Sequence, residues 1–95
     1  MKAEDYFSDE KTIYTITDEH GERSSITVDK WIGDLLQISI PDVHAWVQER
    51  YEYVLKRVPN RSRRERGNAV RELARREAEK SESYIPITHF LGFEK

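Results

Sequence analysis

The sequence predicts an α+β fold in which an N-terminal β-hairpin precedes three helices within one small domain. Two runs of β-branched residues around a glycine predict the hairpin, apolar residues at three- and four-residue spacing predict the helices, and an N-capping sequence marks the start of the last one. The 95 residues, of which 37% are hydrophobic, allow only a modest core. We therefore expect a homodimer, because association supplies stability that a small core lacks.

The hairpin is expected from residues 12–17 (TIYTIT) and 24–28 (SSITV), which a turn over residues 18–22 joins. Side chains alternate between the two faces of a strand, so Ile26 and Val28 share one face of the second strand. The opposite face carries side chains that can form hydrogen bonds: Arg23, Ser25 and Thr27.

Two helices are expected after the hairpin. Asp29 opens a short helix that ends near Ser39, and Pro41 suits the first turn of a second helix that runs to about Arg57. The second helix has Tyr53 off its apolar face, so we expect this tyrosine to be exposed. The apolar face comprises Trp31, Ile32, Leu35 and Leu36 in the first helix, and Val43, Trp46, Val47, Tyr51, Val54, Leu55 and Val58 in the second.

Ser62 and Glu65 predict the start of the third helix, because their spacing is that of a capping box. Residues 61–80 contain eight basic and four acidic residues, a balance of +4, whereas residues 1–60 have a balance of −5. Charge segregated in this way favours a localised binding surface. Four arginines crowd the start of the helix, where positive charge opposes the helix dipole: Arg61, Arg63, Arg64 and Arg66.

An alternative interpretation makes this helix a solvated face that ion pairs stabilise. Oppositely charged residues four positions apart lie next to each other on a helix surface. The sequence offers three such pairs: Arg61 with Glu65, Glu72 with Arg76, and Arg75 with Glu79. The charge pattern leaves both interpretations open.

The two ends differ from the centre in composition. We expect residues 1–10 to form a flexible acidic arm, residues 11–83 to form the folded core, and residues 84–95 to form an apolar tail without helical rhythm. Two interpretations of the tail remain open. It completes the core as a short C-terminal strand, or it docks on a partner through Tyr84, Ile85, Ile87, Phe90, Leu91 and Phe93.

Several function classes are disfavoured by what the sequence lacks. It has no cysteine, and its three histidines lie far apart, so we expect no metal site. It contains no glycine-rich phosphate loop, nucleophile elbow or zinc-protease motif, so we expect no catalytic residues, no cofactor and no enzymatic activity. No apolar run approaches the roughly 20 residues that span a bilayer, so we expect a cytoplasmic protein without membrane contact.

The order of elements over residues 23–58 resembles the ribbon-helix-helix family of DNA-binding repressors. The resemblance is carried by the alternating Ser25-Ile26-Thr27-Val28, by residues 29–36 and by the helix that Pro41-Asp42-Val43 begins. It implies that the strand pairs with its copy in a second subunit and that this ribbon enters the major groove. It also implies that Arg23, Ser25 and Thr27 read bases, and that backbone N–H groups near Pro41 meet phosphate. Whether the strands pair within one chain or between two stays open.

These observations lead to the expectation of a small, dimeric DNA-binding regulator of transcription. A β-ribbon or hairpin reads the bases, and phosphate contacts come from Arg61, Arg63, Arg64, Arg66 and Arg71 of the arginine-rich helix. The sequence does not distinguish DNA from RNA as the partner. The alternative is a protein-interaction module, antitoxin-like or an inhibitor, which docks through its acidic N-terminal arm and its apolar C-terminal tail.

Overall fold

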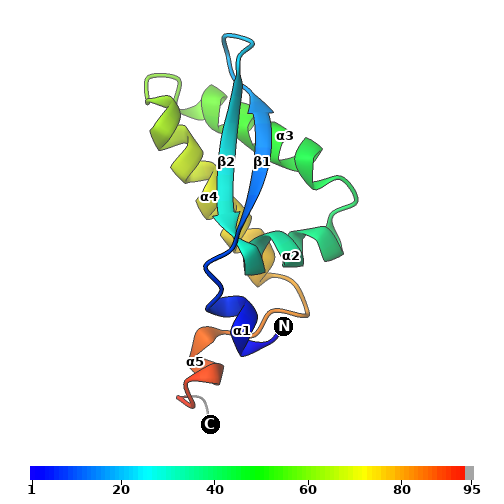
Figure 1. Cartoon of the computed structure of the whole chain (residues 1–95). Helices are drawn as coiled ribbons and strands as arrows, with labels where there is room; N and C mark the ends of the chain where they lie inside the picture. The colour runs from blue at the N-terminus through cyan, green and yellow to red at the C-terminus, as the bar shows by residue number, and fades with distance from the viewer. Residues whose placement is uncertain (94–95) are drawn as a thin grey trace.

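A β-hairpin and the helices that cover one of its faces make up most of the molecule (Figure 1). The computed structural model describes residues 1–93. The elements are α1 (Ala3–Tyr6), β1 (Lys11–Thr17), β2 (Arg23–Asp29), α2 (Lys30–Ser39), α3 (Val43–Arg57), α4 (Arg63–Glu79) and α5 (Ile87–Phe90). The predicted α+β class and the N-terminal hairpin are confirmed.

The two strands pair antiparallel within one chain, with Tyr14 opposite Ile26 and Thr15 opposite Ser25. The turn is fixed by Asp18, whose Oδ1 atom accepts hydrogen bonds of 2.9 Å from the backbone N–H groups of His20 and Glu22. Gly21 has a φ of +76°, a conformation that residues with a Cβ atom rarely adopt. The open question of strand pairing is thereby answered for β1 and β2, which a short local turn joins.

The core lies between the inner face of the hairpin and the helices α2, α3 and α4. Alternation along the strands sends Tyr14 and Ile16 of β1 inward with Ile26 and Val28 of β2. The helices contribute the rest of the buried apolar set: Trp31, Ile32, Leu35, Leu36, Val47, Tyr51, Val54, Val70, Ala74 and Ala78. The outer face of the hairpin stays free of any covering element within residues 1–93, so its side chains meet solvent.

Helix boundaries agree with the sequence except at the start of α3. α2 ends at Ser39 and α3 ends at Arg57, as predicted. α3 begins at Val43, two residues later than the predicted start at Pro41. The reason is that Asp42 acts as the N-cap, because its Oδ1 atom accepts a 3.1 Å hydrogen bond from the backbone N–H of Ala45.

The predicted capping box of α4 is present. The Ser62 hydroxyl accepts a 3.1 Å hydrogen bond from the backbone N–H of Glu65, and the Glu65 carboxylate accepts one from the Ser62 N–H. Tyr53 is 41% exposed, as expected for a residue off the apolar face of α3. Gly33 lies where α2 crosses β1, and a Cβ atom there would come within 2.4 Å of the Thr12 hydroxyl. The glycine therefore permits this close approach.

α1 and α5 lie side by side at the end of the molecule opposite the hairpin turn (Figure 1). Tyr6 of α1 stacks on Trp31 with ring centroids 4.8 Å apart, and Tyr84 stacks on Trp31 at 5.5 Å. The short C-terminal strand is not confirmed, because residues 87–90 form one helical turn. Pro86 precedes this turn and has no N–H to give to a strand ladder. Residues 1–93 form five helices rather than the predicted three, since each end of this range adds a single turn.

None of the helices over residues 1–93 combines the length and the apolar character that crossing a membrane requires.

Candidate functional site

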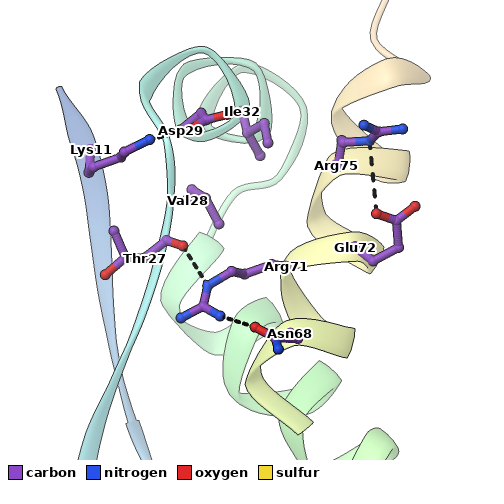
Figure 2. Close-up of a pocket in the computed structure, with 9 residues that line it drawn as sticks. All are labelled: Lys11, Thr27, Val28, Asp29, Ile32, Asn68, Arg71, Glu72 and Arg75. Atoms are coloured by element: carbon purple, nitrogen blue, oxygen red, sulfur yellow. Dashed lines mark hydrogen bonds and ion pairs between the residues drawn. The ribbon is translucent and has the colours of Figure 1, made fainter. Parts of the chain in front are cut away.

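The strand and the helix that the sequence singled out lie next to each other and are joined by Arg71 of α4. Its Nε atom donates a 2.9 Å hydrogen bond to the backbone carbonyl of Thr27 on β2, and its Nη1 atom donates one of 2.5 Å to the Asn68 side-chain oxygen. Figure 2 shows this guanidinium reaching from α4 to β2. The outer strand edge and the arginine-rich helix therefore form one continuous surface.

Two hollows lie along the line where β2 meets α4, and Arg71 lines both. The larger, of about 420 Å³, is bordered by carboxylates as well as cations (Figure 2). In it Lys11 pairs with Asp29 across the hairpin, and the Arg75 Nε atom lies 3.9 Å from Glu72. Lys11 and Arg75 are thus paired with carboxylates of the same hollow, whereas Arg71 is not.

The smaller hollow, of about 290 Å³, has a different charge. Three arginines line it, and none of its lining residues carries a carboxylate: Ile16, Ser24, Ser25, Ile26, Tyr51, Arg63, Arg64, Gly67 and Arg71. Arg63 reaches out of the hollow to Asp18, with 3.3 Å between Nη1 and Oδ2. Arg64 is exposed and forms no ion pair within residues 1–93, and Arg71 is bonded to neutral oxygens only.

Arg66, predicted to contact phosphate, turns inward. Its side chain is only 6% exposed, its Nη2 atom lies 2.6 Å from Glu19 Oε1, and its Nε atom donates to the Tyr51 hydroxyl at 3.4 Å. Its Nη1 atom also donates to the backbone carbonyl of Arg61. We therefore leave Arg66 out of the candidate surface. Its position four residues before Val70 puts it on the buried stripe of α4, and this spacing is a signal for its burial.

The inward Arg66 belongs to a network that fastens the hairpin turn to the start of α4. Burial raises the pKa of the Glu19 carboxyl, but the hydrogen bond from the Tyr51 hydroxyl and the charge of Arg66 outweigh that effect, so the pKa is lowered overall. The pKa of the Asp18 carboxyl is also lowered, chiefly by the hydrogen bond from the Glu22 backbone and also by Arg63. Both acids stay ionised and hold the arginine end of α4 in place.

The other predicted nucleic-acid contacts are accessible. Arg23 is exposed at the start of β2 and forms no ion pair within the described part of the chain, and Ser25 is exposed two residues further along. Thr27 is partly buried beside Arg71. Arg61 is exposed and lies 3.5 Å from Glu65.

The ion pairs of the alternative interpretation are present as well. Arg61 pairs with Glu65 at 3.5 Å, Arg76 with Glu72 at 3.4 Å, and Arg75 with Glu79 at 3.8 Å. Two of these three pairs lie in the C-terminal half of α4, which is therefore a solvated, charge-compensated face. The uncompensated charge lies in the N-terminal half.

Sequence reasoning did not single out Ser24, Gly67 or Asn68. Ser24 and Gly67 line the smaller hollow, and Asn68 orients Arg71. Gly67 is buried, yet a Cβ atom built on it would meet nothing within 4 Å. A glycine within a predicted helix, next to an arginine cluster, is the signal that the sequence contained for this hollow.

The residues predicted to bind a partner through the tail divide into two groups. Tyr84, Ile85, Ile87 and Phe90 are partly buried, and Phe90 packs edge-on against Tyr6 with ring centroids 6.1 Å apart. Phe93 is 75% exposed and Leu91 is 52% exposed. The first group packs on the chain itself, whereas the second leaves an apolar tip open.

No group of three or more His, Asp or Glu side chains within residues 1–93 is arranged to hold a metal ion.

Comparison of the chain with protein-family models, with curated proteins and with solved structures finds no match. The resemblance of residues 23–58 to the ribbon-helix-helix family stays a prediction, and in this chain β2 pairs with β1. A function must therefore be argued from the geometry and charge of the residues themselves.

Proposed function

We propose that the protein is a small DNA-binding regulator that contacts DNA through the outer face of its hairpin and the N-terminal half of α4. The observation that carries this proposal is the junction at Arg71, where the α4 side chain bonds the Thr27 carbonyl of β2. Because of this junction, the side chains expected to read bases lie beside the arginines expected to contact phosphate.

Base readout is assigned to the outer face of the hairpin. The register sets Thr17 opposite Arg23, Thr15 opposite Ser25 and Ile13 opposite Thr27. This face therefore presents hydroxyl side chains and the exposed Ile13, with Arg23 at one end and the Lys11–Asp29 pair at the other. The major groove of B-DNA admits a two-stranded β-ribbon, hydroxyls hydrogen-bond to either base type, and arginine pairs bidentately with guanine. The chain supplies such a ribbon without a second subunit.

Affinity is assigned to Arg61, Arg63, Arg64 and Arg71. Arginine binds phosphate through two parallel N–H donors, and each phosphate that a cation neutralises steepens the log–log salt dependence by about 0.9. We also propose a homodimer, since two such surfaces double the number of phosphate contacts.

The proposal predicts a strong loss of affinity with salt. We expect fluorescence anisotropy to detect binding to a random DNA duplex at about 50 mM salt and a large loss by about 200 mM. The Arg64→Gln variant should bind more weakly and show a salt slope reduced by about 0.9, because one phosphate contact is removed.

Arg76→Gln is the matched control for this titration, since it removes the same charge from a part of α4 outside both hollows. Sedimentation of the same samples measures the oligomeric state, and a matched RNA duplex tests the choice of nucleic acid. Absence of binding at the lower salt concentration, or equal losses for both variants, would contradict the proposal.

A second proposal, a protein-interaction module of the antitoxin or inhibitor kind, draws support from the apolar tip. Phe7, Leu91 and Phe93 are exposed at the end of the molecule where α1 and α5 lie. Exposed aromatic and aliphatic side chains are common anchors of interfaces. A Leu91→Ser, Phe93→Ser double variant should then lose a co-purifying partner while it keeps its affinity for DNA.

A further inference from the structure

We propose that the smaller hollow between β2 and α4 is a pocket for one phosphate group, and that its occupant is a backbone phosphate of bound DNA. The choice of occupant rests on the proposed function, whereas the pocket itself follows from its residues. It is lined by Arg63, Arg64 and Arg71 together with Ser24, Ser25 and Gly67.

The charge of the hollow calls for an anion. Three arginine residues line a space of about 290 Å³ that no carboxylate lines. Asp18 offsets part of the charge of Arg63 from outside, but Arg64 has no acidic partner within residues 1–93, and Arg71 bonds only to the neutral oxygens of Thr27 and Asn68. Like charges that line one hollow repel each other, so a bound anion would stabilise this arrangement.

The donors suit a tetrahedral oxyanion in particular. Two of the arginines are held before any ligand arrives, Arg71 by Thr27 and Asn68, and Arg63 by Asp18. Backbone groups alternate in direction along an antiparallel strand, so the Ser25 N–H points to the same side as the Thr27 carbonyl that Arg71 binds. Arginine forks, serine hydroxyls and a backbone N–H are the donors that phosphate sites use.

Gly67 provides the space. It is a buried position of α4, and a Cβ atom there would meet nothing within 4 Å. Alanine would favour the helix by removing backbone freedom, so helix stability gives no reason for a glycine here. A small residue here leaves room for a ligand next to the helix backbone, because a long side chain at this position would fill the hollow.

The test uses the full-length, 15N-labelled protein, titrated with inorganic phosphate at constant pH and ionic strength. We expect saturable shifts of the Ser25 and Gly67 amide signals. Gly67→Leu, which leaves every charge in place, should weaken phosphate binding at least about tenfold, whereas Gly67→Ala should retain it. Arg64→Gln should weaken it to a similar degree, and Arg76→Gln should leave it unchanged.

Shifts that rise without saturation would contradict the proposal that this hollow binds phosphate. Phosphate affinity that is unchanged in both Gly67→Leu and Arg64→Gln would contradict it as well. Dispersion of the amide spectrum shows whether each variant is folded, and Arg64→Gln decides the matter if Gly67→Leu does not fold.

A second titration of the same variants identifies the source of the phosphate. If a short DNA duplex displaces phosphate, and if it binds Gly67→Leu more weakly than it binds the parent protein, a DNA backbone phosphate is supported as the occupant. If vesicles of anionic phospholipid displace phosphate and DNA does not, that occupant is overturned while the pocket stands. The failure of DNA binding is thus distinguishable from the failure of the pocket.

Discussion

Arg64 and Arg66 lie two residues apart on α4 and have opposite environments. The Arg64 side chain points to solvent beside β2, whereas that of Arg66 is buried against Tyr51 and bonded to Glu19. A composition count treats both as positive charge on one helix. Only the helical period separates them, since Arg66 continues the buried stripe of Val70 and Ala74.

Arg66→Met should lower the thermal stability of the protein. Methionine has a similar length and is apolar, but it leaves the Glu19 carboxylate without its cation and the Arg61 carbonyl without its donor. We expect Tm, followed by circular dichroism, to fall by at least about 4–8 °C. Arg64→Met is the control, and an equal fall in both variants would contradict the burial of Arg66.

The turn should also make stability depend on pH at the acidic end. The pKa of both the Asp18 and Glu19 carboxyls is lowered in the folded chain. The ionised form of each carboxyl therefore stabilises the folded state relative to the unfolded state. Their contribution is present above the unfolded values of about 4 and is lost as pH falls through the lower, folded values. An Asp18→Asn, Glu19→Gln variant should lose less stability than the parent below about pH 4 in urea titrations. A parallel pH dependence of the two proteins would show that these acids do not act as described.

At the scale of elements, the glycines of helices α2 and α4 have different structural roles. Gly33 lets α2 cross β1 at Thr12, whereas Gly67 borders an open hollow. Both are glycines inside predicted helices, where glycine is less favourable than alanine. Their environments differ because tertiary contacts, which no local pattern records, decide what lies above each helix.

Replacement of each glycine by alanine should therefore change stability in opposite directions. Gly67→Ala should raise the free energy of unfolding by about 0.5–1 kcal/mol, since alanine favours the helix and meets no neighbour. Gly33→Ala should lower it by about 1–3 kcal/mol, because its Cβ would lie 2.4 Å from the Thr12 hydroxyl and 2.7 Å from the Thr12 Cβ. Urea denaturation measures both, and effects of the same sign would contradict this account.

Local chemistry explains why some elements were predictable and others were not. The Ser62–Glu65 capping box and the turn at Gly21 depend on residues a few positions apart, and the sequence predicted both. The ion pairs along α4 are equally local, and the sequence offered them as an alternative interpretation. The predicted start of α3 at Pro41 was wrong, because the Asp42 side chain caps the helix and this cap outweighs the preference of proline for a first helical turn. The Arg71–Thr27 bond joins residues 44 positions apart, and no periodicity reports such a contact.

At the scale of the whole molecule, arginines gather in two places that can be compared. One is the junction of β2 and α4. The other is the outer side of α3, where the guanidinium groups of Arg50 and Arg57 lie 5.3 Å and 4.7 Å from the centre of the Tyr53 ring. Exposed acids accompany this second surface, namely Glu49 and Glu52. The chain as a whole has a net charge of −2, so the proposed attraction to DNA has to come from one surface rather than from the overall charge.

Amide chemical-shift mapping with a DNA duplex tests most directly whether β2 and α4 form that surface. We expect the largest shifts on two elements at once, at Arg23, Ser25, Thr27, Arg64 and Gly67, and we expect them to diminish with added salt. The residues around Tyr53 should show none. Shifts confined to α3 or to the α1 and α5 end, or the absence of any shift at low salt, would contradict it.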